Sequence, residues 1–157
     1  MTVLLLELDG VLGDTRPLWD DWLEDSSKIF GLDPGSLPRD RAAAAVELDE
    51  RGAGNWRALL ERYASERAPV YLRPDASVSA ALRALSSAGA RLGVFTDAPV
   101  ELVHVAVAQL GATRRVEAVE CGAGSVERLR ARLGDDGELV TTRARLLELA
   151  RAAANAG

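Results

Sequence analysis

The chain has 157 residues, a hydrophobic fraction of 48% and a formal net charge of -5, with 24 Asp and Glu against 19 Lys and Arg. This length and apolar content predict one compact core, and the acidic balance argues against general affinity for nucleic acid or an anionic membrane surface. A single cysteine, Cys121, excludes an intrachain disulfide, and no apolar run approaches the roughly 20 residues of a membrane span, so we expect a cytoplasmic protein.

The N-terminal segment predicts a buried strand that ends in two acids. Residues 3–8 are almost continuously apolar, and Glu7 and Asp9 are followed at once by Gly10 in a tight turn. Since side chains alternate along a strand, both carboxylates should emerge on the same side. Neighbouring carboxylates repel each other, so we expect a divalent cation or a cationic phosphate site to compensate them.

Residues 14–70 predict helices without a convincing strand. Pro17 suits the first turn of a helix that Gly31 ends, and residues 41–50 and 55–66 predict two more helices. The tryptophans of this segment are expected to form its own core: Trp19, Trp22 and Trp56. Its many arginines could attract an anion, but on an acidic protein we expect them to be solvated.

From residue 71 onward, strands and helices alternate. Asp75 and Ser125 should each cap a helix, and the expected strands and following helices are 91–95 with 99–110, 116–120 with 125–133, and 138–141 with 142–154. Short loops between them predict an α/β fold with a parallel Rossmann-like sheet covered on both faces, in three layers. The strand at 138–141 is expected at a sheet edge, covered by the terminal helix or by a second copy in a homodimer.

In such sheets, ligands bind at the carboxyl ends of the strands. Besides Glu7 and Asp9, the chemistry-bearing side chains expected there are Thr96 and Asp97, which follow the strand at 91–95. On local grounds, either Thr96 or Asp97 could instead be a helix-capping residue, and for Asp97 we favour capping over catalysis.

The run Glu7-Leu-Asp9-Gly10 resembles the Asp-x-Asp-Gly opening of the haloacid dehalogenase-like (HAD) phosphohydrolases, and the stretch from Gly89 to Asp97 is similar to that family's second motif. The resemblance covers essentially the whole chain. It implies a HAD-like core made of residues 1–13 and 71–157, with a small helical cap at residues 14–70. It also implies phosphoryl transfer through an aspartyl-phosphate with Mg²⁺.

The family roles carry over to a few positions. Asp9 matches the general acid/base, and Thr96 matches the hydroxyl that binds the transferring phosphoryl group, so Gly10, Thr96 and Asp97 are the expected ligand-binding residues. Glu7 and Asp9 are the expected Mg²⁺ ligands. Glu7 stands where the family has its nucleophilic Asp, and its extra methylene moves the carboxylate by roughly 1 Å, which can cost on the order of 10²-fold in rate.

Two further motifs depart from the family. The region from Cys121 to Ser125 lacks the family's lysine; the sole lysine is Lys28, in the predicted cap, and Arg128 is the nearest alternative cation. After the last strand, the chain has no acids to hold Mg²⁺, because Asp135 and Asp136 precede that strand.

These departures predict a HAD-like hydrolase-fold protein with impaired or lost phosphatase activity that acts by binding a ligand or a protein partner. The alternative is a Mg²⁺-dependent HAD-type phosphatase or hydrolase acting on a small phosphorylated metabolite with a rearranged site. A third hypothesis has Glu7 act as a base or metal ligand without a covalent intermediate.

Overall fold

The computed structural model describes residues 2–156 and contains a four-stranded sheet in the order β3-β2-β1-β4. The strands are β1 (Val3–Glu7), β2 (Arg91–Thr96), β3 (Ala118–Cys121) and β4 (Glu138–Val140). All three pairings are parallel, and Glu7 lies opposite Phe95 in the register of β1 and β2. The predicted parallel sheet is therefore confirmed, with β3 beginning two residues later than expected.

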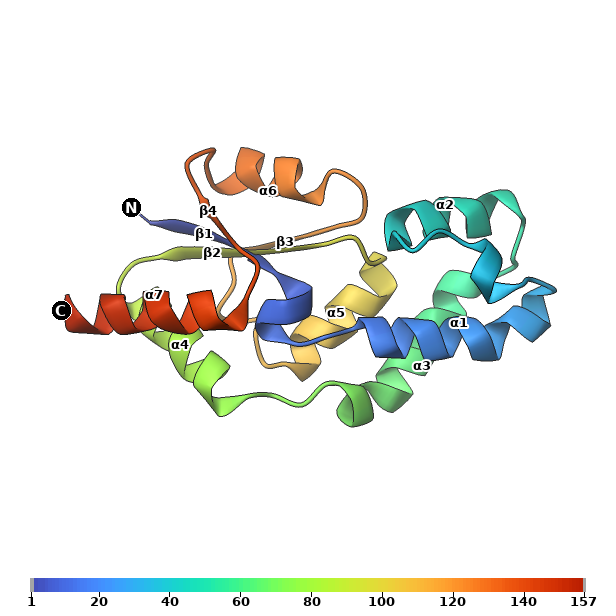
Figure 1. Cartoon of the computed structure of the whole chain (residues 1–157), viewed down its shortest axis with the longest axis horizontal. Helices are drawn as coiled ribbons and strands as arrows, with labels where there is room; N and C mark the ends of the chain where they lie inside the picture. The colour runs from blue at the N-terminus through green and yellow to red at the C-terminus, as the bar shows by residue number, and fades with distance from the viewer. Residues whose placement is uncertain (1, 157) are drawn as a thin grey trace.

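Helices cover both faces of the sheet (Figure 1). α6 (Ser125–Leu133) lies over one face, while α4 (Ala76–Ser87), α5 (Val100–Gln109) and α7 (Arg143–Asn155) lie over the other. The apolar residues between α6 and the sheet are Leu5, Phe95, Ala118, Leu129 and Leu133. The predicted α/β class with three layers is confirmed.

Gly93 in β2 allows α6 to approach the sheet closely. A Cβ at this position would lie 2.6 Å from Cδ1 of Leu133 and 2.7 Å from Cδ1 of Leu129. Real side chains do not tolerate such distances, so the absence of a side chain at Gly93 sets the spacing between the helix and the strand.

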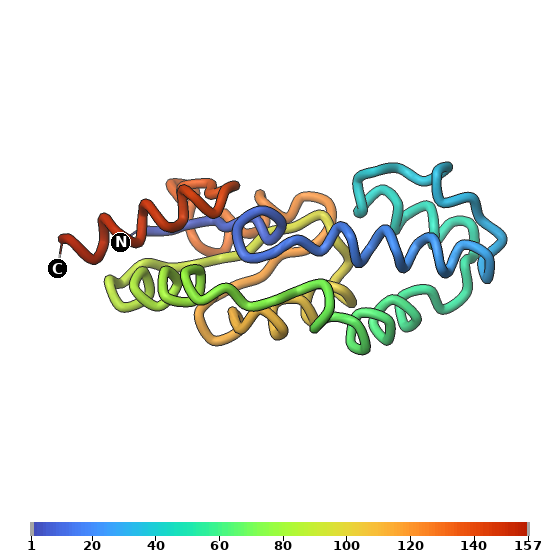
Figure 2. The backbone as a smooth tube through the Cα atoms, turned by 60° about the horizontal axis from the view of Figure 1, so that its bottom comes forward, coloured from blue at the N-terminus to red at the C-terminus, as the bar shows by residue number. Residues whose placement is uncertain are grey.

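Three helices lie between β1 and α4 in the chain: α1 (Arg16–Phe30), α2 (Arg41–Glu50) and α3 (Trp56–Tyr71). They gather beyond the carboxyl ends of the strands and give the molecule its elongated shape (Figures 1 and 2). Trp22 and Trp56 are buried with ring centroids 6.0 Å apart, as expected for the core of this segment. The division into a cap at residues 14–70 and a separate core stays a prediction.

Local signals set several helix ends. Gly31 ends α1 in the left-handed conformation, with φ of 67°, and the Asp75 carboxylate accepts hydrogen bonds from the Ser77 and Val78 amides of α4. The expectation that Ser125 caps α6 is wrong. Ser125 is already the first helical residue, because the turn is made by Gly124 with φ of 71°.

β4 lies at the sheet edge, as predicted, and is only three residues long. A short edge strand offers little backbone for pairing with another chain. The predicted homodimer stays a prediction. No helix within residues 2–156 has the length and apolar character needed to cross a membrane.

Candidate functional site

A tight turn after β1 directs Asp9 into the interior. Glu7 is the last residue of β1, and the chain then turns through Leu8–Leu12, where the Gly10 amide donates to the Gly13 carbonyl at 2.8 Å. Gly10 has φ of 97°, and a Cβ there would lie 3.1 Å from the Thr141 carbonyl oxygen, so only glycine fits without strain. The turn leaves Asp9 only 7% exposed.

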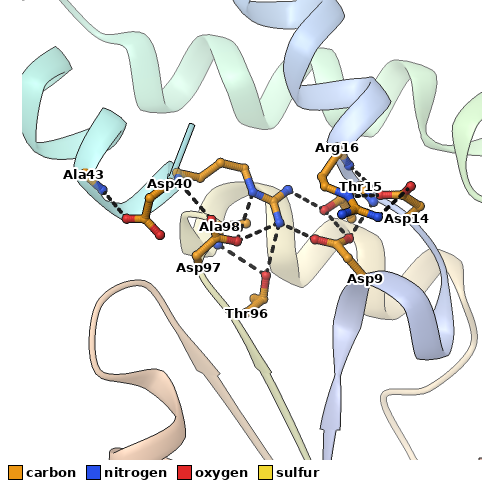
Figure 3. Close-up of polar contacts among 10 residues, drawn as sticks. Asp9, Asp14, Thr15, Arg16, Asp40, Ala43, Thr96, Asp97 and Ala98 are labelled. Atoms are coloured by element: carbon orange, nitrogen blue, oxygen red, sulfur yellow. Dashed lines mark hydrogen bonds and ion pairs between the residues drawn. The ribbon is translucent and has the colours of Figure 1, made fainter. Parts of the chain in front are cut away.

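The end of the neighbouring strand β2 places two more predicted residues beside Asp9. Thr96 is buried, and its Oγ accepts a hydrogen bond from the Ala98 amide at 3.2 Å. Asp97 follows directly. Figure 3 shows Asp9, Thr96 and Asp97 facing a common point beyond the strand ends. The structure thus brings these three predicted site residues together.

A residue that the sequence did not indicate fills that common point. Arg41, at the start of α2, has a side chain only 3% exposed. Its Nη2 forms an ion pair with Asp9 and another with Asp97, the latter at 2.8 Å from Oδ1. One guanidinium from the helical segment therefore bridges the two carboxylates that follow β1 and β2.

Further hydrogen bonds fix this guanidinium. Arg41 Nη1 donates to Thr15 Oγ1 at 2.6 Å, and the Thr15 hydroxyl and amide both donate to Asp9 Oδ1 at 2.7 Å. Arg41 Nε donates to Asp97 Oδ1 at 3.1 Å. Both oxygens of the Asp9 carboxylate therefore have donors from Arg41 or Thr15.

The expectation that the arginines of residues 14–70 are solvated is wrong for Arg41. A weak signal was present in the sequence, because Asp40 predicts a helix start and a cation in the first turn is disfavoured by the helix dipole. The Asp40 side chain does cap α2, accepting from the Ala43 amide at 2.9 Å. Arg41 tolerates this position because Asp97 lies beside it.

The expectation that Asp97 caps its own helix is wrong. α5 begins at Val100 after Pro99, with no side-chain capping bond. Asp97 Oδ2 instead accepts from the backbone amide of Arg41 at 2.9 Å. It therefore stabilises the N-terminus of α2, whose first free amide needs an acceptor.

The site's charges shift the ionisation of its members. Burial acts to lower the pKa of Arg41, but the carboxylates of Asp9 and Asp97 outweigh it and raise that pKa. Burial acts to raise the pKa of Asp97, but the hydrogen bonds from Arg41 outweigh it and lower that pKa. Arg41 and Asp97 therefore stay charged at neutral pH as an ion pair. The pKa of Glu7 is raised, first by burial and then by the nearby charge of Asp9.

These residues lie in a cavity of about 980 Å³ between the helical segment and the strand ends. Its apolar wall includes Trp19, Leu23 and Phe95. Six carboxylates and three guanidiniums line it: Glu7, Asp9, Asp20, Asp40, Asp97 and Glu127, with Arg16, Arg39 and Arg41. The excess of carboxylates disfavours a phosphate dianion.

Gly10 lies apart from this cavity and lines a smaller pocket together with Arg143. Arg143 follows β4, where the family resemblance would place acids. Its Nε donates to the Val11 carbonyl at 3.3 Å, and its Nη1 pairs with Asp75 at 3.4 Å. A guanidinium thus braces the turn after β1.

Arg128 does not supply the cation expected from the third family motif. Its side chain donates to the carbonyls of Cys121 and Ala123 and pairs with Glu120 at 3.3 Å. Burial raises the pKa of the Cys121 thiol to about 11, in accord with a packing role.

The donor set fits Mg²⁺ poorly. Mg²⁺ takes carboxylate oxygens and water in near-octahedral geometry, whereas Asp9 is already bonded to Arg41 and Thr15. The adjacent guanidinium would repel a divalent cation. Within residues 2–156, no group of three or more His, Cys, Asp and Glu side chains is placed to hold a metal.

The fold is similar to that of several solved structures. A structure of CbbY from Rhodobacter sphaeroides in complex with phosphate matches 98% of this chain and 83% of its own, with a TM-score of 0.65 and 14% identity. A HAD phosphatase from Thermococcus onnurineus matches 90% of this chain and 76% of its own, with a TM-score of 0.55 and 19% identity. No protein-family model and no curated protein sequence matches the chain. The likeness to these structures shows that the chain has a HAD-like fold.

Proposed function

We propose that this chain is a HAD-fold protein with little or no phosphatase activity that acts by binding a ligand or a protein partner in the cavity beside Arg41. One observation carries the proposal, namely the Arg41 guanidinium bridging Asp9 and Asp97 in a buried position.

The contacts of Asp9 are unfavourable for proton transfer to a substrate. A general acid/base must reach the substrate with a carboxyl group that is free to exchange a proton. Asp9 is the residue in that position, and its two oxygens accept from Thr15 and from Arg41. With both oxygens held in this way, the Asp9 carboxylate is not free to reach a substrate, and releasing it would leave the buried guanidinium without one of its partners.

The charges at the site are also unfavourable for phosphoryl transfer. Phosphoryl transfer depends on cations that neutralise the transferring group. The cation at this site is itself neutralised by Asp9 and Asp97, and Glu7 adds a further acid. The cavity is therefore better suited to a neutral or cationic molecule than to a phosphate ester.

The second candidate is a Mg²⁺-dependent hydrolase acting on a small phosphorylated molecule. It is favoured by Asp9 after β1 and Thr96 at the end of β2, which stand where the family resemblance places them. It is also favoured by two CbbY structures: one is a complex with phosphate, and the other is a mutant in complex with xylulose-(1,5)bisphosphate. This candidate requires Arg41 to leave Asp9, so that the carboxylate can meet Mg²⁺ and the guanidinium can meet phosphate.

A panel of phosphate monoesters with Mg²⁺ separates the two candidates. We expect the natural protein and Asp9→Asn to show the same background turnover, and Glu7→Asp to restore none, because Asp9 stays bound to Arg41. Robust turnover by the natural protein that Asp9→Asn abolishes would establish the hydrolase instead.

Binding needs a positive test of its own. A thermal-shift screen of neutral and cationic metabolites should yield compounds that stabilise the natural protein. Glu7→Gln and Glu127→Gln should weaken them, since both side chains line the cavity. Glu148→Gln on α7 is the matched control. Hits that respond equally to all three variants would not bind in this cavity.

A further inference from the structure

Four oxygen-bearing side chains surround the Arg41 guanidinium. Asp9 lies in the turn after β1 and Thr15 follows that turn, while Thr96 ends β2 and Asp97 comes next (Figure 3). Asp9, Thr15 and Thr96 are buried, whereas the Asp97 side chain is 36% exposed. The four side chains thus surround the guanidinium, and three of the four are buried.

The acceptors match the three nitrogens of a guanidinium. Nε donates to Asp97 at 3.1 Å, Nη1 donates to Thr15 at 2.6 Å, and Nη2 donates to both Asp9 and Asp97. Arg differs from Lys in that its N–H donors lie in one plane and point in fixed directions from three nitrogens. An ammonium has a single nitrogen, which could take the place of Nη2 between the two carboxylates but not of the separate bonds from Nη1 to Thr15 and from Nε to Asp97.

We propose that Asp9, Thr15, Thr96 and Asp97 form a guanidinium-binding site that the chain fills with its own Arg41, and that this occupancy holds α2 against the sheet. This inference and the proposed function both depend on Arg41, but they are tested by different measurements. Binding of a guanidinium salt tests the site, whereas turnover of phosphate esters tests the proposed function, so either can fail without the other.

The position of Arg41 explains why occupancy would hold α2. Its backbone amide also donates to Asp97, at 2.9 Å, so the helix start and the side chain share one acceptor. α2 is also joined to α3, because Asp49 accepts from Trp56 Nε1 at 2.8 Å and pairs with Arg57 at 2.9 Å. Arg41 adds the buried contact that joins α2 to the carboxylates at the strand ends.

Chemical rescue tests the site. Arg41→Ala empties the site while keeping its four acceptors. Guanidinium or methylguanidinium chloride at millimolar concentration should then raise the Tm of this variant, by roughly 3–6 °C for each tenfold increase above the Kd. Methylammonium chloride, MgCl₂ and NaCl at matched ionic strength should not.

Two controls accompany the rescue. The natural protein should not respond, because its site is filled. Arg51→Ala should not respond either. Arg51 lies at the opposite, C-terminal end of α2 and pairs with Glu47 in a half-exposed position. Equal stabilisation of Arg41→Ala by methylammonium or Mg²⁺, or no stabilisation by any guanidinium salt, would overturn the proposal.

A measurement on the natural protein covers the case in which Arg41→Ala does not fold. In ¹⁵N NMR spectra, the Nη protons of Arg41 should give separate, slowly exchanging signals, because its bonds prevent rotation and exclude water. Arg51 should give averaged, fast-exchanging signals. Arg41 signals that average like those of Arg51 would contradict a filled guanidinium site.

Discussion

Arg41 and Asp97 lie 56 positions apart in the chain, yet Arg41 donates to this one carboxylate through Nε, Nη2 and its backbone amide. The relationship joins the start of α2 to the end of β2. It also places a protein cation between Asp9, which would have to be free to act as a general acid/base, and a second carboxylate at the strand ends. Part of the negative charge at the strand ends is therefore compensated within the chain.

The first prediction concerns the stability of this buried contact. Arg41→Met removes the charge but keeps much of the side-chain volume, and it leaves Asp9 buried without its cation. We expect the free energy of unfolding to fall by about 3 kcal/mol, at the low end for breaking a buried ion pair because Asp97 is partly exposed. Urea denaturation at pH 7 measures the change.

The control is Arg51→Met, which breaks an exposed i, i+4 pair and should cost less than about 0.5 kcal/mol. Equal losses in the two variants would show that the buried contact has no special weight.

The second prediction concerns Asp97 and acid. Its pKa is lowered in the folded protein, so its contribution to stability is full above its unfolded value of about 3.9 and is lost as the pH falls below that value. Asp97→Asn should therefore be less stable than the natural protein at pH 7, and the difference should shrink towards pH 3. Thermal melts across this range test it, and a difference independent of pH would argue against ionisation as its source.

Glu7 should behave in the opposite way. Its pKa is raised in the folded protein, so keeping it charged costs stability at neutral pH, and that cost disappears as the pH falls below its unfolded value of about 4.3. Glu7→Gln should melt at a higher temperature than the natural protein at pH 7 and at the same temperature near pH 4. A Glu7→Gln variant that melts lower at pH 7 would mean that a favourable partner of the Glu7 carboxylate has been lost.

The fourth prediction tests the packing of α6. Gly93→Ala would place a Cβ within 2.7 Å of Leu129 and Leu133, and overpacking of this kind costs about 1–3 kcal/mol. Gly35→Ala is the control, since its nearest contact would be an ordinary 3.5 Å. Urea denaturation of both variants gives the comparison, and equal stability would show that α6 moves away without cost.

The fold and the strand-end residues could be predicted because their signals are local. The apolar run of β1 and the turn at Gly10 place Asp9, and the run of β2 places Thr96 and Asp97. Neighbouring parallel strands then bring these positions together without further information.

Arg41 could not be found in the same way. Its partners Asp9 and Asp97 are 32 and 56 residues away, and its own surroundings in α2 suggest a solvated helix. Only the tertiary fold, which brings the start of α2 near Asp9 and Asp97, decides where the side chain goes. The extent of α3 was missed for a similar reason, because Ala64 and Ala68 are buried and the helix continues through Pro69 to Tyr71.

The most direct test of the account is a crystal structure of the natural protein grown with Mg²⁺ and inorganic phosphate. The account predicts that the Arg41 guanidinium lies between Asp9 and Asp97 with its bond to Thr15 intact, and that no metal binds Asp9. A Mg²⁺ ion on Asp9, with phosphate beside Thr96 and Arg41 withdrawn from both carboxylates, would contradict it.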